Sequence, residues 1–227
     1  MEAEVLDQIP FELDRDRLLR KLHVKEGSTY AADLEKLVGE ALAVARPKAL
    51  YRIAYIDSKN DESVVIDGET FSSRVLRVNL EDTQRVFLYL ATCGTEIEDW
   101  SKAFNDDLLY QFWTDAIKEL ALRSAQGALN DHIKDRFQLG KTITISPGSL
   151  EDWPITEQKP FFKIIGDLSE AIGVQLTESC LMLPIKSISG MRFPTEIRFE
   201  SCQLCPRDVC QGRRAPYDET LYERRFA

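Results

Sequence analysis

Apolar residues recur every three or four positions in two long stretches of the chain, which is the spacing of an amphipathic helix. The first stretch begins after Ser28, a typical N-cap, and ends before Arg46-Pro47. The second runs from Asn105 to Phe137 and meets a stop signal at Leu139-Gly140-Lys141. Shorter helices are predicted at residues 15–22 (after Asp14), 72–78, 156–165 and 167–172.

Other segments are rich in β-branched and aromatic residues, as strands are. Residues 85–92 are almost all apolar and predict a buried strand, followed by a turn at Cys93-Gly94-Thr95 in which Thr95 would cap the next helix. Residues 64–71 read as a hairpin around Asp67-Gly68. Further strands are predicted at residues 49–57, 142–146, 174–176, 180–183 and 196–199.

The order of these elements predicts the fold class. Because turns rather than regular helical crossovers separate the strands, we expect an α+β protein with a twisted, mainly antiparallel sheet and flanking helices, including one long central helix. No repeat, low-complexity tract or flexible linker interrupts the chain. We therefore predict a single domain over residues 1–227, with residues 200–227 as a cysteine-containing C-terminal extension.

Charge and hydropathy exclude two classes of function. The chain has 29 Lys and Arg against 38 Asp and Glu, a net charge of −9, and no basic block, so nucleic acid is not an expected partner. No segment approaches the roughly eighteen apolar residues of a membrane span, and the N-terminus does not resemble a signal peptide. An odd number of cysteines, 5, suits a reducing compartment. We expect a cytoplasmic protein.

Histidine is too scarce for Ser-His-Asp chemistry. Only His23 and His132 occur, both on predicted amphipathic helices, and no nucleophile-elbow sequence accompanies them. Gly140-Lys141-Thr142 ends like a phosphate-binding loop but lacks the upstream glycine that such a loop requires. Neither a hydrolase nor a nucleotide-phosphate site is predicted.

Turns rich in hydroxyls and glycine gather between residues 142 and 199. Ser146-Pro147-Gly148-Ser149 follows a predicted strand, and a Pro-Gly pair breaks regular structure. Such turns, held by strands and helices, are where small ligands commonly make polar contacts, although each also reads as an ordinary turn. The other motifs are Trp153-Pro154, Ile172-Gly173-Val174-Gln175-Leu176-Thr177-Glu178-Ser179, Leu183-Pro184 and Ser187-Ile188-Ser189-Gly190.

The order of these motifs resembles the activation domain of cobalamin-dependent methionine synthase, including its free-standing bacterial relatives. The resemblance implies that fold and a role in returning inactive cob(II)alamin to the methylated or cob(I) form. The family pairs this reduction with methyl transfer from S-adenosylmethionine, and another domain carries the cobalamin. The implied partner is a corrinoid protein or cobalamin-dependent methyltransferase of methionine biosynthesis, and the implied electron donor is a flavodoxin or ferredoxin.

The resemblance also implies a binding loop. In the family, an arginine, three residues and Gly-Tyr cradle S-adenosylmethionine, and the corresponding loop here is Ser146-Pro147-Gly148-Ser149. Gly148 is retained, but Thr144 stands at the arginine position and Ser149 at the tyrosine position. A threonine hydroxyl does not replace a bidentate guanidinium at equal strength. Gln126 stands about where the family has a ligand-contacting Glu.

A surface against the corrin ring is implied as well. Short polar residues suit close approach to a macrocycle, and Met182, Ile185 and Met191 would add apolar contact. From the residues alone, the same segments read equally as a capped turn and a hydroxyl-rich bend. The predicted polar residues of this surface are Glu178, Ser179, Ser187, Ser189 and Gly190.

Three cysteines near the C-terminus, Cys202, Cys205 and Cys210, form a second candidate site outside the resemblance. Thiolates at this spacing can reach one soft metal ion, and Cys180 or Cys93 would supply a fourth ligand if the fold brought one there. The Cys-Pro step at Cys205 favours an iron–sulfur cluster over zinc. The alternative is three reduced thiols that bind no metal.

Together these features predict reductive reactivation of the cobalamin of a separate corrinoid methyltransferase system, with S-adenosylmethionine as methyl donor. In this function protein residues orient two cofactors, and no catalytic residue is assigned. The alternative is a non-enzymatic corrinoid-protein binding or assembly factor that keeps the fold and has lost S-adenosylmethionine binding, which Thr144 and Ser149 favour. The methyl substrate, the particular partner and the oligomeric state are left open.

Overall fold

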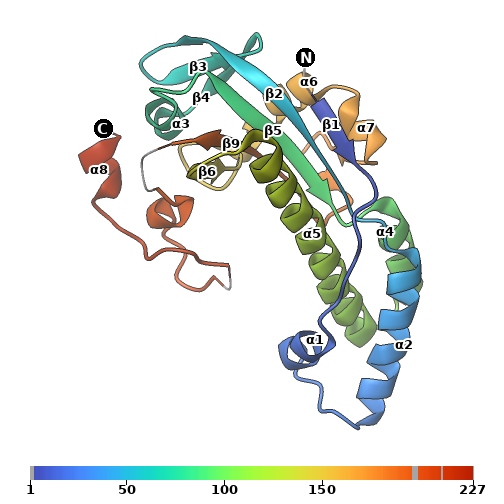
Figure 1. The fold of residues 1–227 in the computed structure, drawn as a ribbon. Coiled ribbons are helices and arrows are strands. Elements are labelled where there is room, and N and C mark those ends of the chain that lie inside the picture. Colours follow the sequence, from blue (N-terminus) through green and yellow to red (C-terminus); the bar gives the residue numbers. More distant parts are fainter. Residues whose placement is uncertain (1–2, 196–198, 211, 227) are drawn as a thin grey trace.

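The computed structural model describes residues 3–195, 199–210 and 212–226. Within these residues, seven strands form one antiparallel sheet in the order β4-β3-β2-β5-β9-β6, with β1 paired to β2. The sheet is twisted, and α5 lies along one of its faces (Figure 1). The strands are β1 (Ala3–Leu6), β2 (Lys48–Lys59), β3 (Ser63–Ile66), β4 (Glu69–Ser72), β5 (Arg85–Thr92), β6 (Thr142–Ile145) and β9 (Ser187–Pro194).

The face covered by α5 holds the first apolar core. α5 (Leu108–Phe137) packs on the sheet near its C-terminal end, where Phe137 contacts Phe87 and Tyr51, and buries Trp113 near its N-terminal end, where it contacts Tyr30. α1, α2 and the N-terminal end of α5 project beyond the sheet (Figure 1). The other elements on this side are α1 (Arg15–Lys21), α2 (Thr29–Val44), α4 (Thr95–Ser101) and the 3-10 turn η1 (Lys102–Phe104).

A second apolar core lies on the opposite face. Successive side chains of a strand point to opposite faces, so Leu88 and Leu90 of β5 enter this core while Phe87 and Tyr89 enter the first. Burial on both faces explains why β5 is almost entirely apolar. The remaining elements are α3 (Arg74–Asn79), η2 (Ile155–Glu157), α6 (Gln158–Ile165), α7 (Leu168–Ala171), β7 (Gln175–Leu176), β8 (Met182–Leu183), η3 (Ser201–Leu204) and α8 (Leu221–Arg225).

The C-terminal extension is packed onto this second core. Phe199 and Phe226 stand at its two ends, are 5% and 1% exposed, and meet edge to face with ring centroids 5.6 Å apart. Burial of two aromatic side chains stabilises such a segment by a few kcal/mol, on the order of 1.5–3 kcal/mol each. The described part of residues 200–227 is therefore held to the body at both ends.

The predicted α+β class is confirmed, as are several helix starts. Asp14 accepts a hydrogen bond from Arg17 N (2.9 Å), and Ser28 Oγ accepts one from Ala31 N (3.2 Å). The long helix begins at Leu108 rather than Asn105, because Asp107 caps it and a 3-10 turn precedes it.

Three local expectations differ from the structure. Residues 187–194 form β9, an inner strand of the sheet, and not a bend. Thr95 is the first residue of α4, whose N-cap is Gly94. Of the strand expected at 196–199, residues 196–198 lie outside the described residues, and Phe199 is not in a strand.

Candidate functional site

A cavity of about 480 Å³ lies on the α5 side of the sheet, where β5, β9 and β6 are neighbours. Four parts of the chain line it: the middle of α5, the sheet, the loop after β6 and the C-terminal extension. A cavity of this size is typical of small-molecule sites. Three of the predicted ligand-binding residues, Gln126, Ser146 and Ser149, line this cavity, together with Thr144.

The Pro-Gly loop is closed by its own backbone. Gly148 N donates to Trp153 O (2.8 Å), and Ser149 donates to Ser146 O through both its N–H (3.0 Å) and its hydroxyl (2.6 Å). Gly148 has φ +80°, and a Cβ there would lie 2.8 Å from Ile155 Cδ1. Ser146 and Ser149 therefore border the cavity, whereas Gly148 shapes the turn and packs on Ile155.

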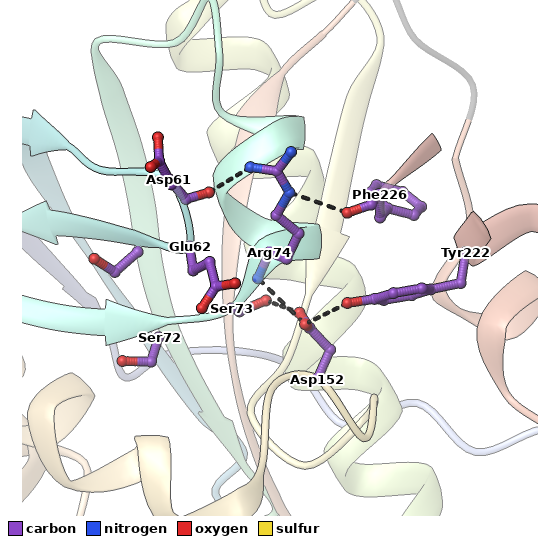
Figure 2. A pocket seen from close by; sticks show the side chains of 9 residues that line it. Asp61, Glu62, Ser72, Ser73, Arg74, Asp152, Tyr222 and Phe226 are labelled. Atoms are coloured by element: carbon purple, nitrogen blue, oxygen red, sulfur yellow. Dashed lines mark hydrogen bonds between the residues drawn. The ribbon is translucent and has the colours of Figure 1, made fainter. Parts of the chain in front are cut away.

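Asp152 ties this loop to two other parts of the chain (Figure 2). Its carboxylate accepts hydrogen bonds from Val75 N (2.9 Å), Arg74 N (3.2 Å) and the Ser73 hydroxyl, which caps the start of α3. The same carboxylate accepts a bond from Tyr222 Oη (3.3 Å) in α8. The loop beside the cavity, α3 and the extension are thus fixed relative to one another.

Tyr89 forms the floor of the cavity. Its side chain is almost fully buried, which raises the pKa of the phenol, and Ser146 hydrogen-bonds to it. Gly190 lies directly opposite on β9. A Cβ at Gly190 would come within 2.6 Å of Tyr89 Oη and 2.9 Å of Ser146 Oγ, so only glycine leaves room for this pair. Gly190 was expected at a corrin surface; the structure buries it beneath the cavity instead.

The α5 wall of the cavity carries a carboxylate held between two cations. Glu119 accepts from Lys21 Nζ (2.7 Å) and from Arg123 Nη2 (2.7 Å). Burial raises the pKa of Glu119, but the hydrogen bonds and charges of Lys21 and Arg123 outweigh it and lower that pKa to about 2. Glu119 is therefore ionised at neutral pH, and Arg123 is largely engaged by it.

The extension supplies the outer wall. Cys202, Cys205 and Arg214 line the cavity, and Arg214 N donates to Cys202 Sγ (3.4 Å). Burial raises the pKa of the Cys202 thiol, but hydrogen bonds from the Arg214 backbone and side chain outweigh it, so the net pKa is below the ordinary value.

The predicted metal site finds no support in the part of the chain that the structure describes. There, no three His, Cys, Asp or Glu side chains form a group that could hold a metal ion. Cys180 is buried in the turn before β8, Cys202 and Cys205 line the cavity, and Cys210 is exposed. The iron–sulfur or zinc site stays a prediction from the cysteine spacing.

The predicted corrin-facing residues divide into two groups. Glu178 and Ser179 are exposed in the turn between β7 and β8, where Thr177 Oγ1 lies 3.0 Å from Ser179 Oγ. Ser187 and Ser189 are buried in β9, where their hydroxyls donate to Thr92 Oγ1 (2.9 Å) and Gln158 Oε1 (3.1 Å). Met191 is fully buried as well. The expectation of direct contact with a macrocycle is wrong for Met191, because no part of it reaches the surface.

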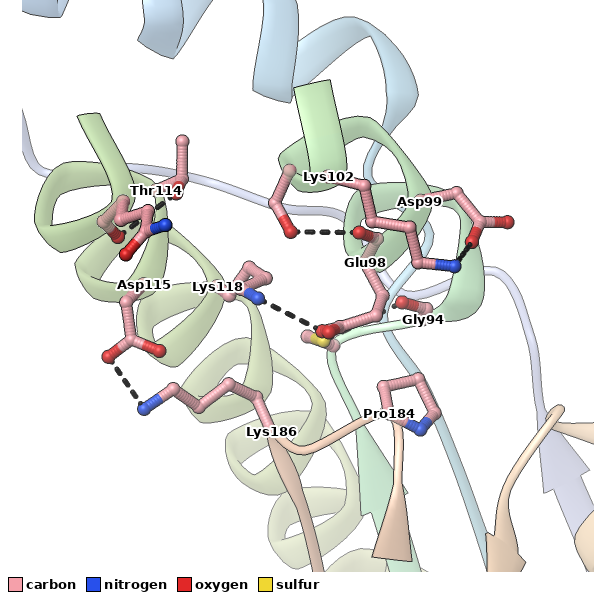
Figure 3. A network of polar contacts seen from close by, with 12 residues as sticks. Gly94, Glu98, Asp99, Lys102, Thr114, Asp115, Lys118, Pro184 and Lys186 are labelled. Atoms are coloured by element: carbon pink, nitrogen blue, oxygen red, sulfur yellow. Dashed lines mark hydrogen bonds and ion pairs between the residues drawn. The ribbon is translucent and has the colours of Figure 1, made fainter. Parts of the chain in front are cut away.

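Apolar side chains are exposed at the end of the molecule near this turn. Leu183 and Ile185 are 44% and 67% exposed, and Leu108 and Phe112 on α5 are 84% and 56% exposed. Lys186 follows Ile185 and pairs with Asp115 (2.8 Å), one helical turn after Phe112 (Figure 3). The name "apolar end" is used below for Leu108, Phe112, Leu183 and Ile185.

A buried ion pair joins α5 to α4 (Figure 3). Lys118 of α5 is 8% exposed and bonds to Glu98 of α4 at 3.1 Å. Burial and the nearby Glu98 raise the pKa of the Cys93 thiol to about 12, with Lys118 opposing. Gly94 has φ +97°, and a Cβ there would clash with the Arg46 carbonyl. The turn at Cys93-Gly94-Thr95 is thus closely packed by protein atoms.

The sequence analysis did not predict several residues that line the cavity, among them Tyr89, Glu119, Arg123 and Arg214. Tyr89 lies in a strand whose apolar pattern indicated only core, and the glycine opposite it is far away in sequence. Arg214 lies in the C-terminal extension, for which only the cysteines were predicted as site residues. The available signal was the Arg213-Arg214 pair within a cysteine-rich segment, which does not indicate where the segment folds.

The architecture defines an α+β protein with a ligand-sized cavity between a long helix and an antiparallel sheet. It is similar to the crystal structure of the MetH reactivation domain bound to AdoHcy, with a TM-score of 0.62 and 12% sequence identity over 88% of this chain and 81% of that chain. No protein-family model and no curated protein sequence matches. The structural likeness confirms the resemblance seen in the motifs and, at this identity, shows the fold alone. Among the described helices, none is both long and apolar enough to cross a membrane.

Proposed function

We propose that the protein binds an S-adenosyl compound in the 480 Å³ cavity and acts in reductive reactivation of the cobalamin of a separate corrinoid methyltransferase. One observation carries the proposal. Gln126 of the long helix and Ser146 and Ser149 of the Pro-Gly loop, all chosen from the sequence, line a single cavity in a fold like that of a domain whose crystal structure contains AdoHcy.

The chemistry of the lining suits such a ligand. AdoHcy has an apolar adenine face, ribose hydroxyls and a charged amino-acid group. The cavity offers Leu122 and Ile188 as apolar surface, the hydroxyls of Thr144 and Ser146 as hydrogen-bonding groups, and charged groups on α5 and the extension. When bound, S-adenosylmethionine would supply an electrophilic methyl group. The residues of this chain would orient it and exclude water.

For the corrinoid partner we propose the apolar end as the docking surface. Two of its exposed apolar residues, Leu183 and Ile185, follow in sequence the turn that exposes Glu178 and Ser179. A corrin ring offers a broad apolar edge with amide substituents, so a mixed apolar and polar surface suits it. The occupant is the cobalamin-carrying protein of the methyltransferase system, reduced by a flavodoxin- or ferredoxin-type donor.

Titration calorimetry with AdoHcy tests the ligand. Wild-type protein should bind AdoHcy, and Gln126→Trp should abolish binding because an indole fills part of the cavity. Lys134→Trp, which adds the same indole at an exposed position of the same helix, should bind like the wild type. Absence of heat with the wild type at millimolar ligand would refute this part of the proposal.

A spectroscopic assay tests the reaction. Cob(II)alamin on a recombinant cobalamin-binding module is mixed with reduced flavodoxin and S-adenosylmethionine, and appearance of the methylcob(III)alamin spectrum is followed. The protein should accelerate it, and Gln126→Trp should not. The second candidate, a binding factor that lacks methyl-donor chemistry, is favoured by Thr144, whose short side chain lines the cavity. It predicts complex formation with the module but neither AdoHcy binding nor acceleration.

A further inference from the structure

The C-terminal extension is anchored at both ends, and described residues between the anchors line the cavity. One end is Phe199; the other is α8, where Arg74 Nε donates to Phe226 O (3.0 Å) and Arg225 donates to Asn79 Oδ1 (3.0 Å). Figure 2 shows Arg74 and Asp152 reaching toward Phe226 and Tyr222 from α3 and the Pro-Gly loop. The segment between the anchors is thus held over the cavity by contacts with the body.

Two adjacent arginines of this segment, Arg213 and Arg214, make different contacts. The Arg213 guanidinium donates to the carbonyls of Cys202 (3.1 Å), Cys205 (3.3 Å) and Ala215 (3.3 Å), and also to that of Arg207. Its N–H groups are used in holding the loop together. Arg214 instead lines the cavity.

Of the two arginines that line the cavity, Arg214 has the guanidinium that a ligand can more easily draw away from its present partner. Arg123 donates through both Nε (3.2 Å) and Nη2 (2.7 Å) to Glu119, a carboxylate that Lys21 also holds. Arg214 pairs with Glu200 at 3.1 Å, and the two side chains are 54% and 46% exposed. Half-exposed pairs of this kind are weak and exchange readily, and a guanidinium has five N–H donors in a planar fork.

We infer that Arg214 binds the α-carboxylate of the S-adenosyl ligand, so that the C-terminal extension completes the site. This inference rests on the proposed function. A guanidinium grips a carboxylate through two parallel hydrogen bonds, and hydrogen bonds to charged groups are the stronger kind. Thr144, Ser146 and Ser149 on the opposite wall offer only hydroxyls. The extension therefore sets specificity for ligands that carry a carboxylate.

The test compares two ligands on the full chain. AdoHcy has the carboxylate, and 5′-methylthioadenosine has the same adenosine and thioether without it. Arg214→Gln should weaken AdoHcy binding by about tenfold to a hundredfold, the range of a charge-assisted hydrogen bond, and change methylthioadenosine binding less than twofold. Arg214→Lys should fall between. Arg224→Gln, which removes an exposed arginine of the same extension paired with Asp218, should change neither.

Each outcome decides the inference. Equal AdoHcy affinity for wild type and Arg214→Gln overturns it, and so does an equal loss for both ligands, which would mean that Arg214 only supports the fold. Thermal melts that match the wild type exclude unfolding, and Arg214→Lys provides the folded comparison if the Gln variant melts early. Wild-type protein that binds methylthioadenosine but not AdoHcy overturns the inference and keeps an adenosyl site. Wild-type protein that binds neither refutes the proposed function as well.

Discussion

Replacing Gly190 by alanine should destabilise the protein through the floor of the cavity. The added Cβ would lie 2.6 Å from Tyr89 Oη, 2.8 Å from Tyr89 Cζ and 2.9 Å from Ser146 Oγ. Tyr89 is 4% exposed and so has little space into which to move. Overpacking of this kind costs roughly 1–3 kcal/mol. Loss of the Tyr89–Ser146 hydrogen bond adds about 1 kcal/mol.

One effect of the Gly190→Ala substitution stabilises the folded protein. Alanine restricts the unfolded chain and thereby stabilises by about 0.4–1 kcal/mol wherever the native backbone accepts it. Gly190 lies in β9 and needs no left-handed conformation, so this gain applies. The net expectation is a loss of about 2 kcal/mol in the free energy of unfolding, or about 4–8 °C in Tm for a chain of this size.

Urea unfolding followed by tryptophan fluorescence measures this change, since Trp113 and Trp153 are both buried. Gly127→Ala is the matched control: Gly127 lies inside α5, and nothing lies within 4 Å of an added Cβ. That variant should gain about 0.5–1 kcal/mol. Tyr89→Phe combined with Gly190→Ala should recover only part of the loss, because Cζ remains. A Gly190→Ala protein as stable as the wild type would refute the packing argument.

Three further predictions concern single side chains. Asp152→Ala should lower the free energy of unfolding by about 2 kcal/mol in urea, since it removes the acceptor of the Arg74 and Val75 N–H groups at the start of α3 and the tie to α8. The pKa of Glu119 is lowered to about 2 in the folded state, so its contribution to stability is present above pH 4.5 and is lost as the pH falls toward 2. The Tm of Glu119→Gln should therefore fall less than the Tm of the wild type over this pH range. Iodoacetamide should label Cys202 in the folded protein at a lower pH than a free cysteine, and should leave Cys93 unlabelled.

Each of these three predictions has a control variant or a control residue. Glu151→Ala, an exposed neighbour of Asp152, should leave stability unchanged, and equal losses for both variants would contradict the capping role. Exposed Glu26→Gln should follow the wild-type acid melting curve; if Glu119→Gln follows it too, the ion pairs with Lys21 and Arg123 carry no measurable stability. Mass spectrometry that finds Cys93 alkylated as fast as Cys202 would show that burial does not protect it.

The long helices are the part of this fold that the regular spacing of apolar residues predicts. α2 and α5 were predicted nearly to their ends, because each has a buried stripe that only a helix can align, and Ser28 is a local cap that needs no tertiary partner. β9 was missed for the opposite reason. Its Ser187 and Ser189 are polar, and they become core residues only because Thr92 and Gln158 satisfy their hydroxyls after folding.

The residues that line the cavity also fall into a group that was predicted and a group that was missed. Gln126, Ser146 and Ser149 were chosen from a resemblance of motifs, which carries information about a fold that spacing alone lacks. Tyr89 and Arg214 were not found, because each depends on which distant segments become neighbours. The metal site at the three C-terminal cysteines stays a prediction from their spacing; in the described residues the Arg213 guanidinium bonds to backbone carbonyls of this segment.

α5 holds the apolar end and the cavity at a fixed distance from each other. Phe112, Glu119 and Gln126 recur every seven residues, so they lie on one side of the helix, and at 1.5 Å per residue Phe112 and Gln126 are about 21 Å apart. A short peptide bound at the apolar end would not reach the level of the cavity. A folded domain of about 100 residues, with a radius of gyration of about 13 Å, is wide enough to touch both at once. Any partner that senses whether the cavity is filled while seated on the apolar end must therefore present a rigid surface of domain size.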